Sequence, residues 1–275
     1  MLIARSIHPE VMSGCQRGSM SFSRDKKPVF RPLTDKTFRF RCHSAISCFT
    51  SCCADLKLML TPYDVLRIKN RLGLSSQAFL EEYTVTTYDP SERFPRLLLK
   101  MQQNEKKTCP FVTRDGCTIY EDRPGACRIY PVGRASITVQ DQEAAREKFF
   151  MIQEEHCLGF QEDRQWSVEE WMAGEGLGDY NKMNDRWMQI LTSPKSLGSE
   201  KDVHRKLKMF FMASFNLDRF RDFIFKSSFL RLFSLENSLI EALASDDVTL
   251  MCFGFQWLRF SLFGEKTMKM ASETR

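Results

Sequence analysis

Apolar side chains recur at helical spacing in two regions of the chain. In the first, residues 61–73 read TPYDVLRIKNRLG, with apolar positions every three or four residues. Thr61 begins a T-x-x-D capping pattern, Pro62 suits the first helical position, and Gly73 is typical of a helix end. This pattern predicts a helix, and residues 76–83 predict a second, shorter one.

The second helical region begins near Ser167, which starts the capping-box pattern SVEE ahead of Trp171. Helical spacing continues over residues 180–191, and the turn-rich segment SPKSLGSE (193–200) follows as a predicted boundary. Phenylalanine is dense after this boundary, which favours a packed helical core or a dimer face over an aromatic ligand pocket. Three or four helices are predicted there, over Asp202–Phe215, Leu217–Phe225, Leu235–Ala244 and Asp247–Phe263.

The middle of the chain contains short segments typical of strands. The predicted strands are Arg96–Gln102, Thr118–Tyr120 and Ala135–Gln140. Between the last two, Pro124 suits the start of a short helical turn that presents Cys127. The whole pattern predicts an α+β fold, in which a loop-rich core of short strands and helices precedes an all-helical C-terminal extension.

This pattern divides the chain into a flexible basic leader (1–37), a core domain (38–192) and a helical extension (201–270). Residues 1–41 hold nine Lys or Arg and three acidic residues, so they carry a net charge of +6, against +5 for the whole chain. A basic arm of this kind is usually solvated. No motif for specific nucleic-acid recognition lies beside it.

Length and composition are those of a globular protein. The 275 residues are 43% hydrophobic and 27% charged, which is enough for one or two domains with real cores. The most apolar stretch, residues 250–263, is too short to span a membrane and contains Arg259. The first residues show no secretory signal, so we expect a cytoplasmic protein whose thiols stay reduced.

Eight cysteines between positions 42 and 157 are the main chemical signal. Reduced thiols at this density indicate ligation of zinc or of an iron–sulfur cluster. Their spacings match neither a standard zinc finger nor a ferredoxin. The adjacent Cys52 and Cys53 point apart, so they do not share one small ion without strain. The candidate metal ligands are Cys42, Cys48, Cys52, Cys53, Cys109, Cys117, Cys127 and Cys157.

Other residues near these cysteines carry a weaker signal. His43 and His156 each lie beside a cysteine, so either could bind metal or donate a hydrogen bond to a ligand. Most single histidines do neither, and this is the favoured interpretation of both. Cys252 lies in an apolar segment and is expected in the core. Five arginines are expected to offset thiolate charge or to form surface ion pairs: Arg41, Arg114, Arg123, Arg128 and Arg134.

These motifs resemble the YkgJ-like cysteine-cluster family, over roughly residues 38–160. The most specific part is CPF followed by GC-x-IYE-x-RP-x2-C-R-x-YP, from Cys109 to Pro131. The adjacent pair Cys52–Cys53 is kept, with longer gaps before it than the family's usual C-x2-C-x2-CC. The family is described as a zinc- or iron-chelating domain, so the resemblance implies metal binding. It implies nothing about the residues after 200.

Three hypotheses follow. The first is a cytoplasmic metal-binding protein that holds zinc or an iron–sulfur cluster, with a 4Fe–4S cluster favoured because more than four thiols converge. The second is an iron–sulfur-dependent protein lysine methyltransferase-like enzyme that uses S-adenosylmethionine. It is implied by one branch of the resembled family, the flagellin lysine N-methylases. The third is a metal store or sensor. A protein partner for the helical extension and the oligomeric state stay open.

Overall fold

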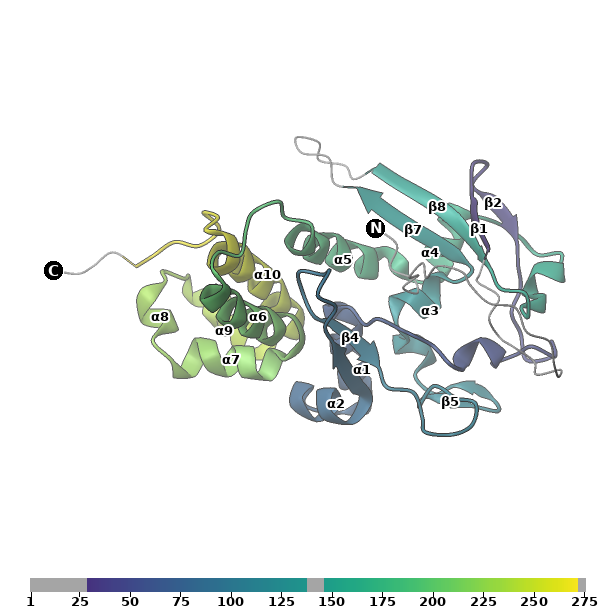
Figure 1. Ribbon diagram of the computed structural model, residues 1–275, viewed down its shortest axis with the longest axis horizontal. Coiled ribbons are helices and arrows are strands. Elements are labelled where there is room, and N and C mark those ends of the chain that lie inside the picture. Colours follow the sequence, from purple (N-terminus) through teal and green to yellow (C-terminus); the bar gives the residue numbers. More distant parts are fainter. Residues whose placement is uncertain (1–28, 138–145, 272–275) are drawn as a thin grey trace, which may run out of the picture. The chain divides into compact units, whose positions relative to one another are not determined.

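The computed structural model describes residues 29–137 and 146–271 (Figure 1). It combines short strands in small sheets, loops and a helical C-terminal region, which confirms the predicted α+β class. Most of the predicted leader and residues 138–140 of the predicted strand Ala135–Gln140 lie outside the described residues. Residues 29–32, which we assigned to the flexible leader, instead form a paired strand.

The chain forms two compact units, and each is assembled from several separate segments. The cysteine unit contains the described residues through Met59, together with Met101–Thr118 and Ala126–Glu175. The helical unit contains Leu60–Lys100, Ile119–Gly125 and the described residues from Gly176 onward. The domain boundaries that we expected near residues 192 and 201 stay a prediction.

The cysteine unit is built on small antiparallel sheets. Its largest sheet has three strands, in which β8 (Arg146–Gln153) lies between β1 (Val29–Pro32) and β7 (Val132–Ile137). Two further pairs are β2 (Thr37–Arg39) with β9 (Gln165–Ser167), and β5 (Val112–Thr113) with β6 (Gly116–Cys117). Its helical turns are η1 (Ser51–Cys53), most of α3 (Gly125–Ile129), η3 (Leu158–Gln161) and α4 (Val168–Gly174).

Aromatic side chains form the core of this unit. Phe40 is 2% exposed and packs edge-to-face on Trp171, with ring centroids 5.7 Å apart. The indole nitrogen of Trp171 donates a 3.0 Å hydrogen bond to the carbonyl oxygen of Ile129, the last residue of α3. The predicted capping box of Ser167 and Glu170 is confirmed at the start of α4. These contacts tie α3, and with it Cys127, to the core.

One predicted strand, Thr118–Tyr120, is wrong. The strand β6 ends at Cys117, and Tyr120–Asp122 form the 3-10 turn η2. Thr118 still pairs with the hairpin, since its amide and its hydroxyl donate to the carbonyl oxygen of Phe111, at 2.9 and 3.1 Å, and the chain enters η2 two residues later. Pairing therefore does not extend to Ile119, whose apolar side chain is 2% exposed and is explained by its burial.

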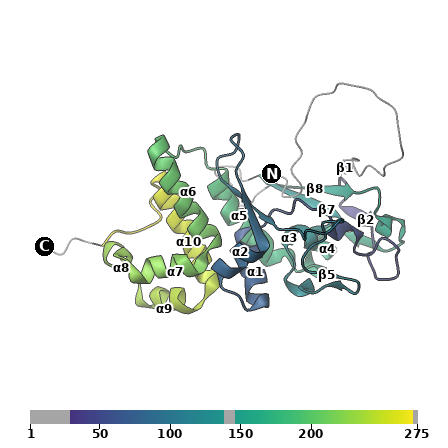
Figure 2. The same ribbon diagram turned by 60° about the horizontal axis from the view of Figure 1, so that its bottom comes forward.

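The helical unit contains most of the helices (Figures 1 and 2). It also contains η2 and a hairpin of β3 (Thr84–Thr87) and β4 (Arg96–Leu99). The strand β4 ends three residues before the predicted strand Arg96–Gln102 does. The helices are α1 (Pro62–Leu72), α2 (Ser76–Tyr83), α5 (Leu177–Leu191), α6 (Glu200–Phe215), α7 (Leu217–Lys226), α8 (Phe229–Leu232), α9 (Asn237–Ser245) and α10 (Asp247–Phe263).

The predicted helices and the predicted aromatic core are confirmed. Thr61 and Asp64 form the capping box of α1, and Gly73 ends it with φ 66°. Helix α10 contacts α5, α6, α7 and α9, and it lies alongside α6 in Figure 2. Gly254 allows this approach, because a Cβ there would lie 3.0 Å from the carbonyl oxygen of Ala213. The four-residue helix α8 was not predicted, because it is too short for a periodic pattern.

Among the helices described, none is both long enough and apolar enough to cross a membrane.

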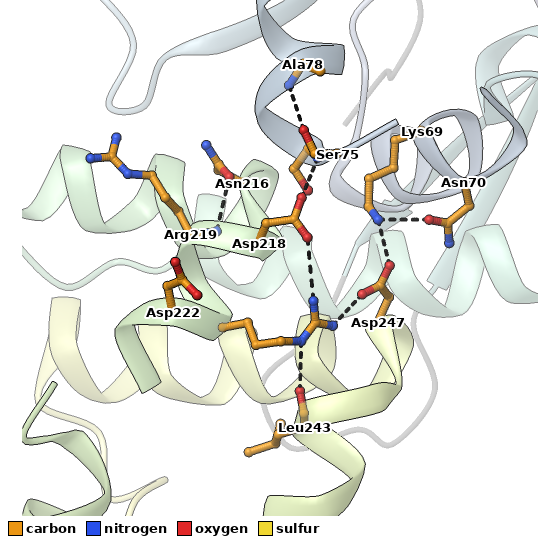
Figure 3. A network of polar contacts seen from close by, with 12 residues as sticks. Lys69, Asn70, Ser75, Ala78, Asn216, Asp218, Arg219, Asp222, Leu243 and Asp247 are labelled. Carbon is orange, nitrogen blue, oxygen red and sulfur yellow. Dashed lines mark hydrogen bonds and ion pairs between the residues drawn. The ribbon is translucent and has the colours of Figure 1, made fainter. Parts of the chain in front are cut away.

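A buried ionic network joins helices of this unit that are far apart in sequence (Figure 3). The amine of Lys69 on α1 lies 2.7 Å from the carboxylate of Asp247, which begins α10. Arg221 on α7 pairs with the other oxygen of Asp247 at 2.5 Å. The side chains of Lys69 and Asp247 are 6% and 20% exposed. Breaking this pair therefore leaves a buried charge without its partner.

We predict that Asp247→Asn lowers the free energy of unfolding by about 3 kcal/mol, because Lys69 then keeps a buried, uncompensated charge. Urea denaturation followed by circular dichroism measures this change. Asp222→Asn is the matched control, because Asp222 pairs with Lys226 at the surface, where an ion pair contributes less than about 1 kcal/mol. Equal losses in the two variants would contradict the assignment.

The pH dependence of the same variant supplies a second readout. Burial alone would raise the pKa of Asp247, but hydrogen bonds from Lys69 and Arg221 outweigh it and hold the pKa below its ordinary value. A carboxyl whose folded pKa is depressed stabilises the fold above its ordinary pKa, and this stabilisation is lost as the pH falls through the folded value. The difference in stability between the wild type and Asp247→Asn should therefore shrink below about pH 4.

Candidate metal centre

All eight cysteines that we predicted as ligands lie in the cysteine unit. They come from separate elements: Cys52 and Cys53 from η1, Cys117 from the end of β6 and Cys127 from α3. Cys157 directly precedes η3, and Cys42, Cys48 and Cys109 lie in loops. All are thiols and not disulfides. Cys42 is exposed, and the other seven are partly buried.

Backbone contacts between two loops bring the first group of cysteines to the second. The amide of Cys109 donates to the carbonyl oxygen of Cys53 at 2.8 Å. Next to this contact, Ala54 and Thr108 form an isolated antiparallel bridge. Segments more than fifty residues apart in sequence are therefore held side by side at the cysteines.

Seven of the predicted ligands form one group. Cys53 hydrogen-bonds Cys52 and interacts electrostatically with Cys109 and Cys127. Cys109 interacts with Cys52 and Cys117, and Cys157 interacts with Cys48 and Cys52. Cys52 is common to all three sets. We call this group the thiol cluster: Cys48, Cys52, Cys53, Cys109, Cys117, Cys127 and Cys157.

Backbone amides donate hydrogen bonds to several of these sulfurs. The amide of Leu158 lies 3.2 Å from the sulfur of Cys48. The amides of Phe111 and Val112 hydrogen-bond the thiol of Cys109. The amide of Gly159 does the same for Cys157. Such N–H···S bonds favour the thiolate form and are one of the means by which proteins tune metal–thiolate centres.

Burial and the neighbouring sulfurs oppose ionisation of these thiols. Burial raises the pKa of Cys109 to about 11, and the neighbouring sulfurs of Cys117 and Cys52 add to the rise. The pKa of Cys53 is raised strongly, first by its hydrogen bond with Cys52 and then by burial. Burial also raises the pKa of Cys157. Several thiolates in one place repel one another, and a bound cation reverses this because it stabilises every one of them.

Two residues beside Cys157 have roles that the sequence did not indicate. The hydroxyl of Tyr130 interacts with the Cys157 thiol and partly offsets the rise in its pKa, while the Tyr130 ring packs on Phe40 with centroids 5.9 Å apart. At Gly159, an added Cβ would lie 2.7 Å from the ring of Phe40 and 2.9 Å from the carbonyl oxygen of Arg41. Only glycine therefore brings its amide to Cys157 without displacing Phe40. The signal for Gly159 in the sequence was its position two residues after Cys157.

The histidines and arginines near the cysteines have other partners. His43 lies 3.3 Å from Glu162, and His156 lies 3.6 Å from Glu154. Arg128 donates to the carbonyl oxygen of Glu175 at 2.7 Å. The other arginines named above are exposed (Arg41 and Arg114), paired with Glu147 at 2.6 Å (Arg134) or stacked on the ring of Tyr120 at 3.6 Å (Arg123).

Cys252 lies apart from the thiol cluster, in the helical unit. It is half-buried on α10, and its sulfur lies 3.6 Å from the sulfur of Met183 and 3.1 Å from a guanidinium nitrogen of Arg186. This placement agrees with the expectation of a packing cysteine.

The chemistry of the thiol cluster fits a metal that prefers sulfur, because soft thiolates converge and amide groups donate to three of them. Over residues 29–137 and 146–271, no three Cys, His, Asp or Glu side chains are arranged to hold a single ion. The cluster is therefore a pool of ligands and not a closed four-ligand cage.

We predict that Gly159→Ala lowers the free energy of unfolding by about 1–3 kcal/mol, because the new methyl group forces Phe40 or the backbone of Arg41 to move. Thermal denaturation measures the effect, and metal retention against a chelator should fall with it. Gly174→Ala, at the end of α4, is the matched control, since nothing lies within 4 Å of its added Cβ. A loss as large at Gly174 would contradict this explanation.

One family model matches the chain, over residues 41–162, and it is described as "CxxCxxCC: Putative zinc- or iron-chelating domain". No curated protein and no solved structure matches the chain significantly. The matched segment contains all eight predicted ligands, from Cys42 to Cys157. It therefore includes every cysteine of the thiol cluster. The match to this family of cysteine-cluster domains covers 122 of the 275 residues, and it supports metal binding by this segment.

Proposed function

We propose that the thiol cluster holds an iron–sulfur cluster, and that this centre ties together the loops of the cysteine unit. The observation that carries the proposal is the convergence of seven thiols from separate segments, three of which accept backbone N–H hydrogen bonds. Thiolates with amide donors are the ligands of iron–sulfur clusters, whose potentials depend on those hydrogen bonds. The family description supports zinc or iron equally.

The number and spread of the thiols favour a polynuclear centre over a single zinc ion. A structural zinc site uses four ligands, usually supplied as two close pairs. Here interactions between sulfur atoms connect seven cysteines, which is more than one four-ligand zinc site uses. A 4Fe–4S cluster offers four separate iron atoms to ligands on different sides, so it accepts such a spread with less strain.

The ligands in this proposal are drawn from the thiol cluster. Cys109 is the best single test, because its sulfur accepts two amide hydrogen bonds and interacts with sulfurs of both cysteine groups. Cys42 is exposed and stays in the ligand pool as a prediction. When bound, the cluster would supply an electron-transfer or Lewis-acid centre.

We predict that Cys109→Ser, purified without oxygen, loses most of the bound iron, the acid-labile sulfide and the visible absorption of the wild type. Elemental analysis and an absorption spectrum of the same sample measure these losses. Cys252→Ser is the matched control, because it removes a half-buried thiol outside the thiol cluster and should leave metal content unchanged. Unchanged metal in Cys109→Ser would exclude Cys109 as a ligand.

The same samples distinguish the two metals. Iron with sulfide in the wild type supports the proposed cluster. A colourless protein with stoichiometric zinc would replace it with a zinc–thiolate site on the same residues. The methyltransferase and metal-store alternatives and the cytoplasmic location rest on the sequence alone and stay predictions.

A further inference from the structure

The segment Ile119–Gly125 joins two members of the thiol cluster and belongs to the helical unit. Cys117 precedes it and Cys127 follows it, and both of these belong to the cysteine unit. We call Ile119–Gly125 the linking segment. Its position along the chain means that whatever holds it also restricts the two thiols at its ends.

Helix α1 holds the middle of the linking segment through Arg67. Two nitrogens of the guanidinium lie 2.8 and 2.6 Å from the same carboxylate oxygen of Asp122. One of them also donates to the carbonyl oxygen of Glu121 at 3.4 Å. The side chain of Asp122 is 16% exposed, so this ion pair is largely shielded from water. Such charge-assisted contacts are stronger than neutral hydrogen bonds.

Asp64 and Tyr180 hold the end of the segment that leads to Cys127. One oxygen of the Asp64 carboxylate accepts the amide of Gly125 at 2.8 Å, and the other belongs to the capping box of α1. Asp64 is 1% exposed. The buried hydroxyl of Tyr180 donates to the carbonyl oxygen of Arg123 at 3.1 Å. An added Cβ at Gly125 would lie 3.2 Å from the ring of Tyr180, so this approach is close.

These contacts reach both thiols through a short length of chain. Asp122 is five residues from Cys117 and five from Cys127, and Gly125 is two residues from Cys127. Consecutive Cα atoms are about 3.8 Å apart, so fixing Gly125 confines the Cα of Cys127 to about 7.6 Å around it. The 3-10 turn η2 shortens the segment further. The segment therefore acts as a held spacer between two thiols.

We infer that Arg67 and Asp64 of α1 are positioning residues for the metal centre, because they hold the segment that spaces Cys117 and Cys127. This inference rests on the proposed function, since it requires those two thiols to bind metal. Neither residue needs to touch the metal. They act as outer partners that orient ligands, a role whose loss typically lowers metal affinity 10–100-fold. On this account, contacts within the helical unit fix the length of chain that spaces Cys117 and Cys127.

The test uses the full chain and cobalt(II), which binds thiolates with a charge-transfer absorption that grows with the number of bound sulfurs. The variants are Arg67→Met and, as a matched control, Lys69→Met. Both residues lie on α1 and both pair with an aspartate of the helical unit, but the partner of Lys69 is Asp247, outside the linking segment. Cobalt titration, release to a chelator and the free energy of unfolding are measured for each.

We expect Arg67→Met to weaken cobalt binding about tenfold and to lower the absorption per bound cobalt. Lys69→Met should lower stability and leave both metal readouts unchanged. Arg67→Lys, which keeps the charge, should restore part of the affinity. If Arg67→Met does not fold, Asp122→Asn removes the same ion pair from the other side. A merely structural role would lower stability in all of these variants without changing the absorption per cobalt.

Two outcomes would overturn the inference while the proposed function stands. The first is an Arg67→Met protein that binds cobalt with wild-type affinity and absorption, while Cys109→Ser has lost both. In that case the proposed metal centre stands, and only the positioning role of Arg67 is contradicted. The second is an equal metal loss in Lys69→Met, which would reduce the effect to general destabilisation. Wild-type cobalt binding in Cys109→Ser would instead contradict the proposed function, and the inference would fall with it.

Discussion

The burial of closely spaced thiols is the constraint on which the cysteine unit depends. Electrostatic interactions connect seven sulfurs, and burial is the main cause that raises the pKa of Cys109 and Cys157, while for Cys53 the hydrogen bond with Cys52 comes first and burial second. Amide hydrogen bonds to the sulfurs of Cys109 and Cys157 lower their pKa, but by less than the other causes raise it. A cation resolves this conflict, because it stabilises several thiolates at once and couples metal binding to folding.

The local structure around the site was largely readable from the sequence. Thr61, Pro62 and Gly73 predicted both ends of α1, and Pro124 predicted the short helix α3 that carries Cys127. These predictions succeeded because caps and turns depend on neighbouring residues. The strand Thr118–Tyr120 failed for the opposite reason. Ile119 is buried by tertiary packing and Tyr120 is exposed, while the pairing with Phe111 ends at Thr118, before η2 begins.

The assembly of the site was not readable, because it depends on contacts between distant segments. The spacing of the cysteines gave no indication that Cys53 and Cys109 are joined through a backbone hydrogen bond. Asp64 was recognised as a helix cap, but its second role, accepting the amide of Gly125, links positions 61 residues apart. Gly159 was also missed, since only the position of Phe40 explains why a side chain is excluded there.

X-ray absorption spectroscopy of the anaerobically purified protein, at the iron and zinc edges, tests the central claim most directly. The account predicts a first shell of about four sulfur atoms per metal, near 2.3 Å, with iron neighbours in the second shell when an iron–sulfur cluster is present. A first shell of nitrogen and oxygen at about 2.0–2.1 Å would contradict thiolate ligation, and so would the absence of any metal in stoichiometric amount.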